Sequence, residues 1–128
     1  MSLTRQTIDL TPRELPREKV PAPEWASPDV KPEDAYVWVR TMEGEERDKW
    51  EESLTVQGGK KIKVNLDGIR AKLAVKTCVD DDGNQLFTEE DIAKLNKLSC
   101  LPLARVFDVA SRLNGLSQED IDDIVGKS

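Results

Sequence analysis

The chain has 128 residues and a formal net charge of −6, and it contains no histidine. Its length suits one compact domain with a tail rather than two separate cores. Apolar residues make up 38% and charged residues 34%, against typical values of ~45–50% and ~25%. The acidic balance argues against a nucleic-acid partner, because neutralising phosphates requires an excess of Lys and Arg.

Catalysis and cofactor binding are not expected from this composition. Without histidine the chain lacks the usual general base at neutral pH and the commonest metal ligand. Cys78 and Cys100 have no CxxC spacing and lie among apolar residues, which is typical of free thiols in a reducing compartment. No apolar run approaches the ~20 residues of a membrane span. We therefore expect a cytoplasmic protein with no membrane partner.

The N-terminal third is predicted to be extended. Six of the seven prolines occur in the first 32 residues, where they prevent regular helix. Residues 1–17 are predicted to form a flexible arm in front of a single domain over residues 18–126. Within that domain, Glu18–Trp25 and Ala35–Thr41 are predicted to pair as a small hairpin with a loop near Ser27–Asp34.

Residues 43–126 show helical spacing. The expected helices begin at Glu43, Asn65, Thr88, Ser99 and Ser117, and a short extended piece is expected at Lys60–Val64. The helix from Asn65 is expected to run to about Val79, and the helix from Ser99 is expected to end in a left-handed cap at Asn114-Gly115. The predicted fold class is α+β, mainly α: a two-stranded hairpin or extended arm packed on a bundle of about five helices. The residues assigned a structural role are Trp38, Trp50, Arg47, Arg70, Gly83, Phe87, Phe107, Leu113 and Gly115.

The acidic run Asp80–Asn84 resembles part of a calcium-binding loop. With Gly83 at position six of an EF-hand pattern, Asp80, Asp82 and Glu89 occupy ligand positions. The first ligand position is then Cys78, which binds calcium poorly. A tight turn with solvated carboxylates is the preferred interpretation, and a calcium-responsive regulatory module is the alternative.

Several apolar residues are candidates for contact with a protein partner. Trp25 lies in the proline-rich segment, where it is the tryptophan expected to be most exposed. A stripe at Ile92, Leu95 and Leu98, and a second at Ile121, Ile124 and Val125, could line a groove for an amphipathic helix. The competing interpretation assigns both stripes to the chain's own core.

The order of the motifs is more informative than any one of them. Pro23-Glu24-Trp25, Val37-Trp38-Val39-Arg40 and Glu43–Asp48 are followed by Ile69–Leu73, Val79–Gly83 with Leu86-Phe87, Glu90-Asp91, and Ala110–Ser117. In this order and spacing they resemble the tail assembly chaperones of long-tailed (siphovirus-type) bacteriophages and prophages. The resemblance spans roughly Val20 to Val125.

The resemblance implies a protein without catalytic residues that works in the cytoplasm of the bacterial host. Such chaperones bind the tape measure protein, keep it soluble, help to recruit tail tube subunits, and are absent from the finished virion. A frameshifted longer form contacts the tail tube protein in many phages, and self-association along the client would add avidity. A structural protein of the particle and an enzyme with a cysteine nucleophile remain alternatives.

Overall fold

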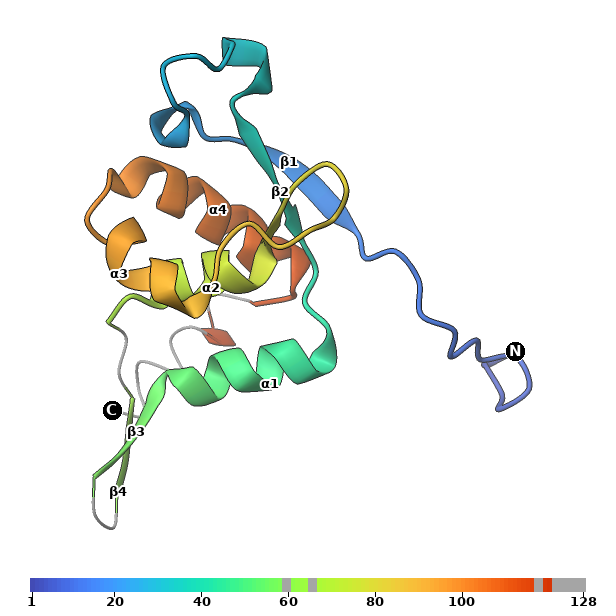
Figure 1. Cartoon of the computed structure of the whole chain (residues 1–128). Helices are drawn as coiled ribbons and strands as arrows, with labels where there is room; N and C mark the ends of the chain where they lie inside the picture. The colour runs from blue at the N-terminus through green and yellow to red at the C-terminus, as the bar shows by residue number, and fades with distance from the viewer. Residues whose placement is uncertain (59–60, 65–66, 117–118, 121–128) are drawn as a thin grey trace.

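The computed structural model describes residues 1–58, 61–64, 67–116 and 119–120 (Figure 1). The strands and α-helices are β1 (Arg17–Pro21), β2 (Tyr36–Arg40), α1 (Gly44–Ser53), β3 (Thr55–Gly58), β4 (Lys61–Val64), α2 (Ile69–Thr77), β5 (Cys78–Val79), α3 (Ile92–Leu95) and α4 (Cys100–Leu113). Three single 3-10 turns lie between them: η1 (Pro23–Trp25), η2 (Pro32–Asp34) and η3 (Glu89–Asp91). The predicted α+β class is confirmed.

An antiparallel sheet with strand order β1-β2-β5 lies at the centre of the fold. Trp38 of β2 has Lys19 of β1 on one side and Val79 of β5 on the other. Because side chains alternate across a strand, Val37 and Val39 are buried while Trp38 lies half-buried on the opposite face. The helices α2 and α4 pack against the inner face (Figure 1). The outer face therefore presents Trp38 and its neighbours to the connecting loops.

The predicted hairpin on a five-helix bundle is not the arrangement found. β1 and β2 do pair, but they belong to a three-stranded sheet, because Cys78 and Val79 leave α2 and pair with β2. Cysteine and valine fit a strand as well as a helix. The apolar spacing of the sequence therefore predicted a helix that ends about two residues too late. A separate two-stranded sheet joins β3 to β4 at the predicted extended piece.

The predicted helix boundaries also change. The helix expected from Asn65 begins at Ile69, after Gly68 with φ +69°, and Asn65 itself lies outside the described residues. The helix expected from Thr88 is divided into η3 and the single turn of α3, although the Thr88–Asp91 capping box is present. The last predicted helix lies outside the described residues apart from Glu119 and Asp120.

The core lies between the sheet, α1, α2 and α4. Trp50 of α1 is 1% exposed, as expected for a core tryptophan. Phe87, Phe107 and Leu113 are partly buried against the same core. The largest fully buried side chains are Trp50, Leu54, Leu73, Val20, Val39, Val75, Val79, Val106, Thr77, Pro102 and Cys78.

The helix α4 has a defined signal at each end. The Ser99 hydroxyl accepts a hydrogen bond from Leu101 N, which satisfies one of the free amides of the first turn. At the other end Gly115, with φ +68°, donates to Arg112 O while Leu116 N donates to Ser111 O at 2.7 Å. This pair of bonds is the Schellman arrangement, so the predicted left-handed cap at Gly115 is confirmed.

The end of α4 is tied to the segment between β2 and α1. The buried Asn114 side chain accepts a hydrogen bond from Met42 N at 2.6 Å and donates to Ala110 O at 2.8 Å. The Arg47 guanidinium donates to Asn114 O at 2.7 Å. Arg47 therefore has the structural role that the sequence suggests, because it joins α1 to the end of α4.

Residues 1–16 form an arm that extends away from the body of the molecule (Figure 1). It is one residue shorter than predicted, since Arg17 is the first residue of β1. Thr7 N and Ile8 N both donate to Thr4 O, which makes one local turn near the tip. Among the described residues, no helix has both the length and the apolar composition that crossing a bilayer would require.

Candidate protein-binding groove

The Asp80–Asn84 loop forms a tight turn held by its own first residue. The Asp80 Oδ1 atom accepts hydrogen bonds from Asp82 N and Asn84 N, both at 2.9 Å. Gly83 has φ +85°, a conformation that costs glycine little. The aspartate that could have offered a calcium ligand therefore satisfies backbone amides instead.

The next residue, Asp81, attaches this loop to the outer face of the sheet. Its carboxylate accepts hydrogen bonds from Trp38 Nε1 at 2.6 Å and from the Tyr36 hydroxyl at 3.0 Å. The bond from Trp38, followed by that from Tyr36, lowers the pKa of Asp81. The guanidinium of Arg17 donates to Asp81 O at 3.1 Å and its Cζ lies 4.3 Å from the centre of the Trp38 ring. Trp38 therefore has a structural role, as a donor and stacking partner on the outer face.

The three candidate calcium ligands do not form one site. Glu89 pairs with Lys76 at 3.1 Å, while Asp80 is engaged in its own turn. Within the part of the chain that the structure describes, no three acidic or cysteine side chains are placed to hold a metal ion. The arrangement of Asp80, Asp82 and Glu89 thus gives no support to the calcium alternative.

The predicted contact residues have different positions. Trp25 is half-buried, with its ring edge-on to Phe87 at a centroid distance of 5.3 Å and an interplanar angle of 76°. Ile92 is partly buried against the core. Leu95 is only 3% exposed, so its prediction as a contact residue is wrong: it closes the chain's own core. Ile121, Ile124 and Val125 lie outside the described residues.

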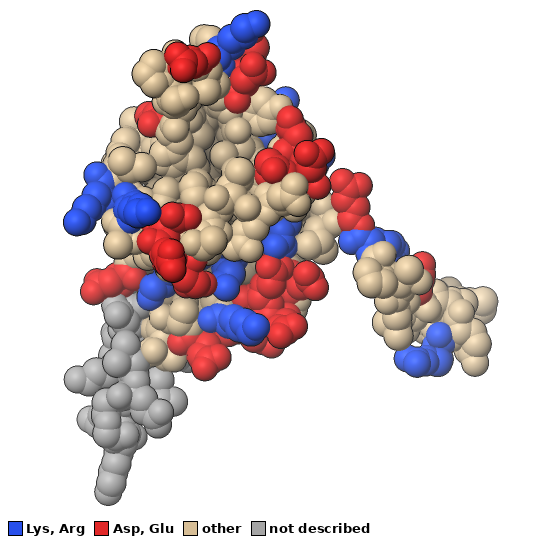
Figure 2. All heavy atoms as spheres, in the orientation of Figure 1, with Lys and Arg blue, Asp and Glu red and all other residues tan. Residues whose placement is uncertain are grey.

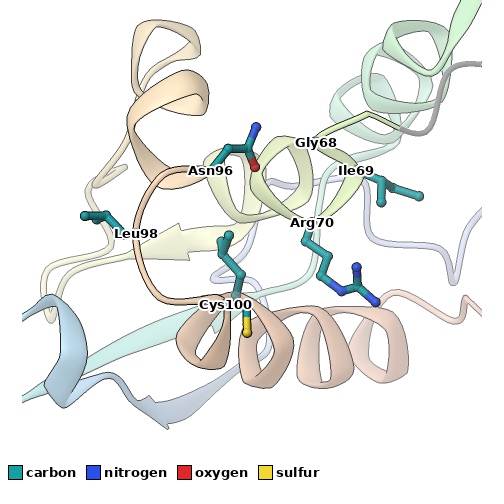
Figure 3. A pocket seen from close by; sticks show the side chains of 7 residues that line it. Gly68, Ile69, Arg70, Asn96, Leu98 and Cys100 are labelled. Atoms are coloured by element: carbon teal, nitrogen blue, oxygen red, sulfur yellow. The ribbon is translucent and has the colours of Figure 1, made fainter.

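A shallow groove of about 210 Å³ lies beside α3, where the N-terminus of α2 faces the turn into α4 (Figure 3). We call it the α3–α4 groove, and its lining is mixed, with polar and apolar surface in similar amounts. Leu98 and Leu101 at this corner are 55% and 53% exposed, more than the other large apolar side chains of the described body. The residues that line the groove are Gly68, Ile69, Arg70, Asn96, Leu98, Cys100 and Leu103.

The shape of the groove depends on a close approach between α2 and the end of α3. A Cβ atom added at Gly68 would lie 2.9 Å from Asn96 Nδ2 and 3.7 Å from Ile92 Cγ2. Gly68 also has the positive φ that other residues adopt at a cost. Glycine at this position therefore allows the α3 segment to approach α2 and sets one wall of the groove.

The groove carries one charged side chain among its lining residues. Arg70 extends from α2 toward α4, as Figure 3 shows, and its Cζ lies 5.4 Å from the centre of the Phe107 ring. Figure 2 shows acidic and basic side chains interspersed over the visible face of the body. The groove thus combines apolar side chains with Arg70 and Asn96 in its lining, and an amphipathic helix has both kinds of surface to offer such a groove.

No family model, curated protein or solved structure matches the chain.

Leu101 is the residue of this corner that the sequence analysis did not select. The core stripe of α4 runs through Leu103, Val106 and Ala110, and Leu101 is two positions before it, close to the opposite side of the helix. That offset is a signal present in the sequence. A large apolar residue outside the core stripe at the start of a helix either packs against the residues that cap the helix or is exposed to solvent.

The two cysteines have similar apolar neighbours in the sequence, but they have different environments in the structure. Cys78 is buried at the end of α2, and this burial raises the pKa of its thiol to about 12. Cys100 is exposed in the first turn of α4 and lines the α3–α4 groove. Apolar neighbours in the sequence therefore do not determine whether a thiol is buried.

Proposed function

We propose that the chain is a tail assembly chaperone of the kind found in long-tailed (siphovirus-type) bacteriophages and prophages. In this role it binds the tape measure protein in the cytoplasm of the bacterial host and keeps it soluble. It also helps to recruit tail tube subunits and is absent from the mature virion. The ordered motifs from Pro23 to Ser117 support the family assignment, and no catalytic step is part of the proposal.

The observation that carries the binding role is the pair of exposed leucines at the corner between α3 and α4, of which Leu98 lines the α3–α4 groove. Leu98 and Leu101 each leave more than half of their surface in solvent, and Leu98 lines the groove together with Ile69 and Leu103. A chain with only 38% apolar residues would gain stability by burying them. Their exposure is explained if an apolar stripe of a client helix covers them.

A tape measure protein is a long amphipathic helix, and it would offer such a stripe at many points along its length. Each α3–α4 groove is small, so a single contact is expected to be weak. Many copies along one client would produce a strong overall association through avidity. This fits a chaperone that must be displaced when the tail tube polymerises.

Co-expression with the tape measure protein of the same phage or prophage tests the proposal. With the wild-type chain the tape measure protein is expected to remain in the soluble fraction and to co-purify. Leu98→Asp and Leu101→Asp each place a charge on the apolar contact and are expected to reduce the co-purified amount at least about tenfold. Asn84→Asp adds the same charge in the exposed Asp80–Asn84 turn and serves as the matched control.

Two results would count against the proposal. The tape measure protein could be equally insoluble with and without the wild-type chain. Alternatively, both leucine variants could co-purify with it as well as the Asn84→Asp control does. The first result removes the function, whereas the second removes only the groove as its site.

A further inference from the structure

A second groove lies along β2, beside the segment that connects β1 to β2. Two adjoining hollows of about 230 and 200 Å³ share Asp34, Tyr36 and Leu86, and so form one continuous depression. It extends between the segment that connects β1 to β2 and the loop that follows β5. Trp38 lines one end and Trp25 the other. We call it the loop groove.

The loop groove is apolar along its centre and acidic at its side. Leu86 and Val30 are 41% and 38% exposed, and both line it. Asp81 raises the pKa of Tyr36 by accepting its hydrogen bond, and the nearby charge of Asp34 raises it further. Arg17 and Lys19 already lie over the rings of Trp38 and Tyr36 at one end of the groove. Asp34 lines both hollows, so a segment that binds beside Asp34 should carry aliphatic side chains together with a cation.

The N-terminal arm has this chemistry. Leu3 is 73% and Ile8 is 45% exposed. Residues 1–8 contain one charged side chain, the cation of Arg5, and no acidic residue. Figure 2 shows the arm as a protrusion clear of the body. Both the arm and the loop groove thus expose apolar side chains that a mutual contact would remove from water.

The direction of β1 favours a groove on another molecule. Pro21, at the end of β1, lies opposite Tyr36, so β1 runs toward the loop groove and the arm leaves from its far end. Pro12 and Pro16 stiffen the arm against turning back along β1. Sixteen residues in an extended form reach about 50 Å, which is ample for contact with a neighbour.

We propose that the N-terminal arm of one copy binds in the loop groove of a second copy, with Leu3 and Ile8 against Leu86 and Arg5 near Asp34. Each copy carries one arm and one groove, so the contact is heterologous. Two copies that exchange their arms form a pair, whereas copies that each bind the arm of the next form a longer chain. The inference does not depend on the function proposed above, because it concerns only copies of this chain.

Sedimentation velocity of the full chain, from about 10 µM to about 1 mM, tests the contact in the range expected for a small interface. The wild-type sedimentation coefficient is expected to rise with concentration. Leu3→Ser and Leu86→Ser are each expected to raise the dissociation constant about tenfold. Gln6→Ser on the arm and Asn84→Ser beside the groove are the matched controls, and they should associate like the wild type.

A charge exchange establishes that the contact is between molecules. Arg5→Asp and Asp34→Arg are each expected to weaken self-association when tested alone. In a mixture of these two variants, each arm meets a groove of opposite charge on the other variant, and association is expected to return. Arg5 and Asp34 are both exposed, and circular dichroism of each variant checks that the fold is kept.

Three results would overturn the inference. The wild-type chain could remain monomeric over the whole range, the Leu3→Ser variant could associate as the wild type does, or the mixed charge variants could fail to associate. If the wild type self-associates but the mixed charge variants do not, the arm does not bind the loop groove of another copy.

Discussion

The Asp80–Asn84 loop and the α3–α4 corner use polar and apolar residues in opposite ways. The loop contains three consecutive aspartates, yet Asp80 and Asp81 direct their carboxylates at groups of the protein itself. The corner between α3 and α4 is apolar, yet Leu98 and Leu101 are exposed. These polar residues hold the domain together, whereas the exposed leucines form the contact surface that we propose.

Among the polar side chains that hold the domain together, Asn114 is expected to contribute most to the free energy of unfolding. Asn114→Ala leaves Met42 N without its acceptor inside the protein, which typically costs about 1–3 kcal/mol. Chemical denaturation should show this loss in the free energy of unfolding. Asn84→Ala, at an exposed position of the turn, is the matched control and should change it little. Equal effects of the two substitutions would contradict the role given to Asn114.

A smaller loss is expected when the loop is detached from the sheet. Asp81→Ala removes the acceptor of both Trp38 Nε1 and the Tyr36 hydroxyl. The free energy of unfolding should fall, and amide hydrogen exchange should rise in the residues of the loop. Asp82→Ala removes a neighbouring exposed carboxylate as the control. Hydrogen exchange that stays unchanged in Asp81→Ala would show that the loop is held by other contacts.

The contact between η1 and α4 should depend on pH. Arg105 donates two hydrogen bonds to the Glu24 carboxylate, at 2.8 and 2.6 Å, and lowers the pKa of Glu24 to about 2. A carboxylate with a lowered folded-state pKa stabilises the fold above its ordinary value of 4.5 and loses that contribution as the pH falls toward 2. The difference in unfolding free energy between the wild type and Glu24→Gln should therefore be largest near neutral pH. A difference that stays constant down to pH 2 would contradict this assignment.

The smallest effect on stability is expected at the exposed corner. Leu101 is 53% exposed, so Leu101→Ser should change the free energy of unfolding by less than about 0.5 kcal/mol. The same substitution should weaken binding of the tape measure protein. Thermal denaturation and co-purification together separate the two effects. A large loss of stability would show that Leu101 belongs to the core and not to a contact surface.

Local signals in the sequence identified the features that depend on neighbouring residues. The caps at Ser99 and Gly115, the Thr88–Asp91 capping box and the buried Trp50 could all be predicted from short patterns. The third strand could not, because Cys78 and Val79 are compatible with helix or strand until β2 is present to pair with them. Long-range pairing of this kind leaves no periodic trace in so short a segment.

The candidate site shows the same limit. Of the predicted helical stripe through Ile92, Leu95 and Leu98, only Leu98 lines the α3–α4 groove, and the sequence cannot say which member faces inward. Packing against α2 buries Leu95 and leaves Leu98 exposed. Likewise the spacing of Asp80, Asp82 and Glu89 matches three positions of a calcium loop. Tertiary contacts with Lys76 and the turn amides then direct two of these side chains elsewhere.

Cys100 offers the most direct measurement of the central claim, that the α3–α4 groove binds the client. Its exposed thiol lines the groove, and the buried Cys78 provides an internal control in the same molecule. Alkylation of the native chain, followed by mass spectrometry, should modify Cys100 quickly and Cys78 hardly at all. In complex with the tape measure protein, alkylation of Cys100 should slow at least about tenfold, as expected when a groove is covered. An unchanged alkylation rate at Cys100 in an intact complex would contradict the account.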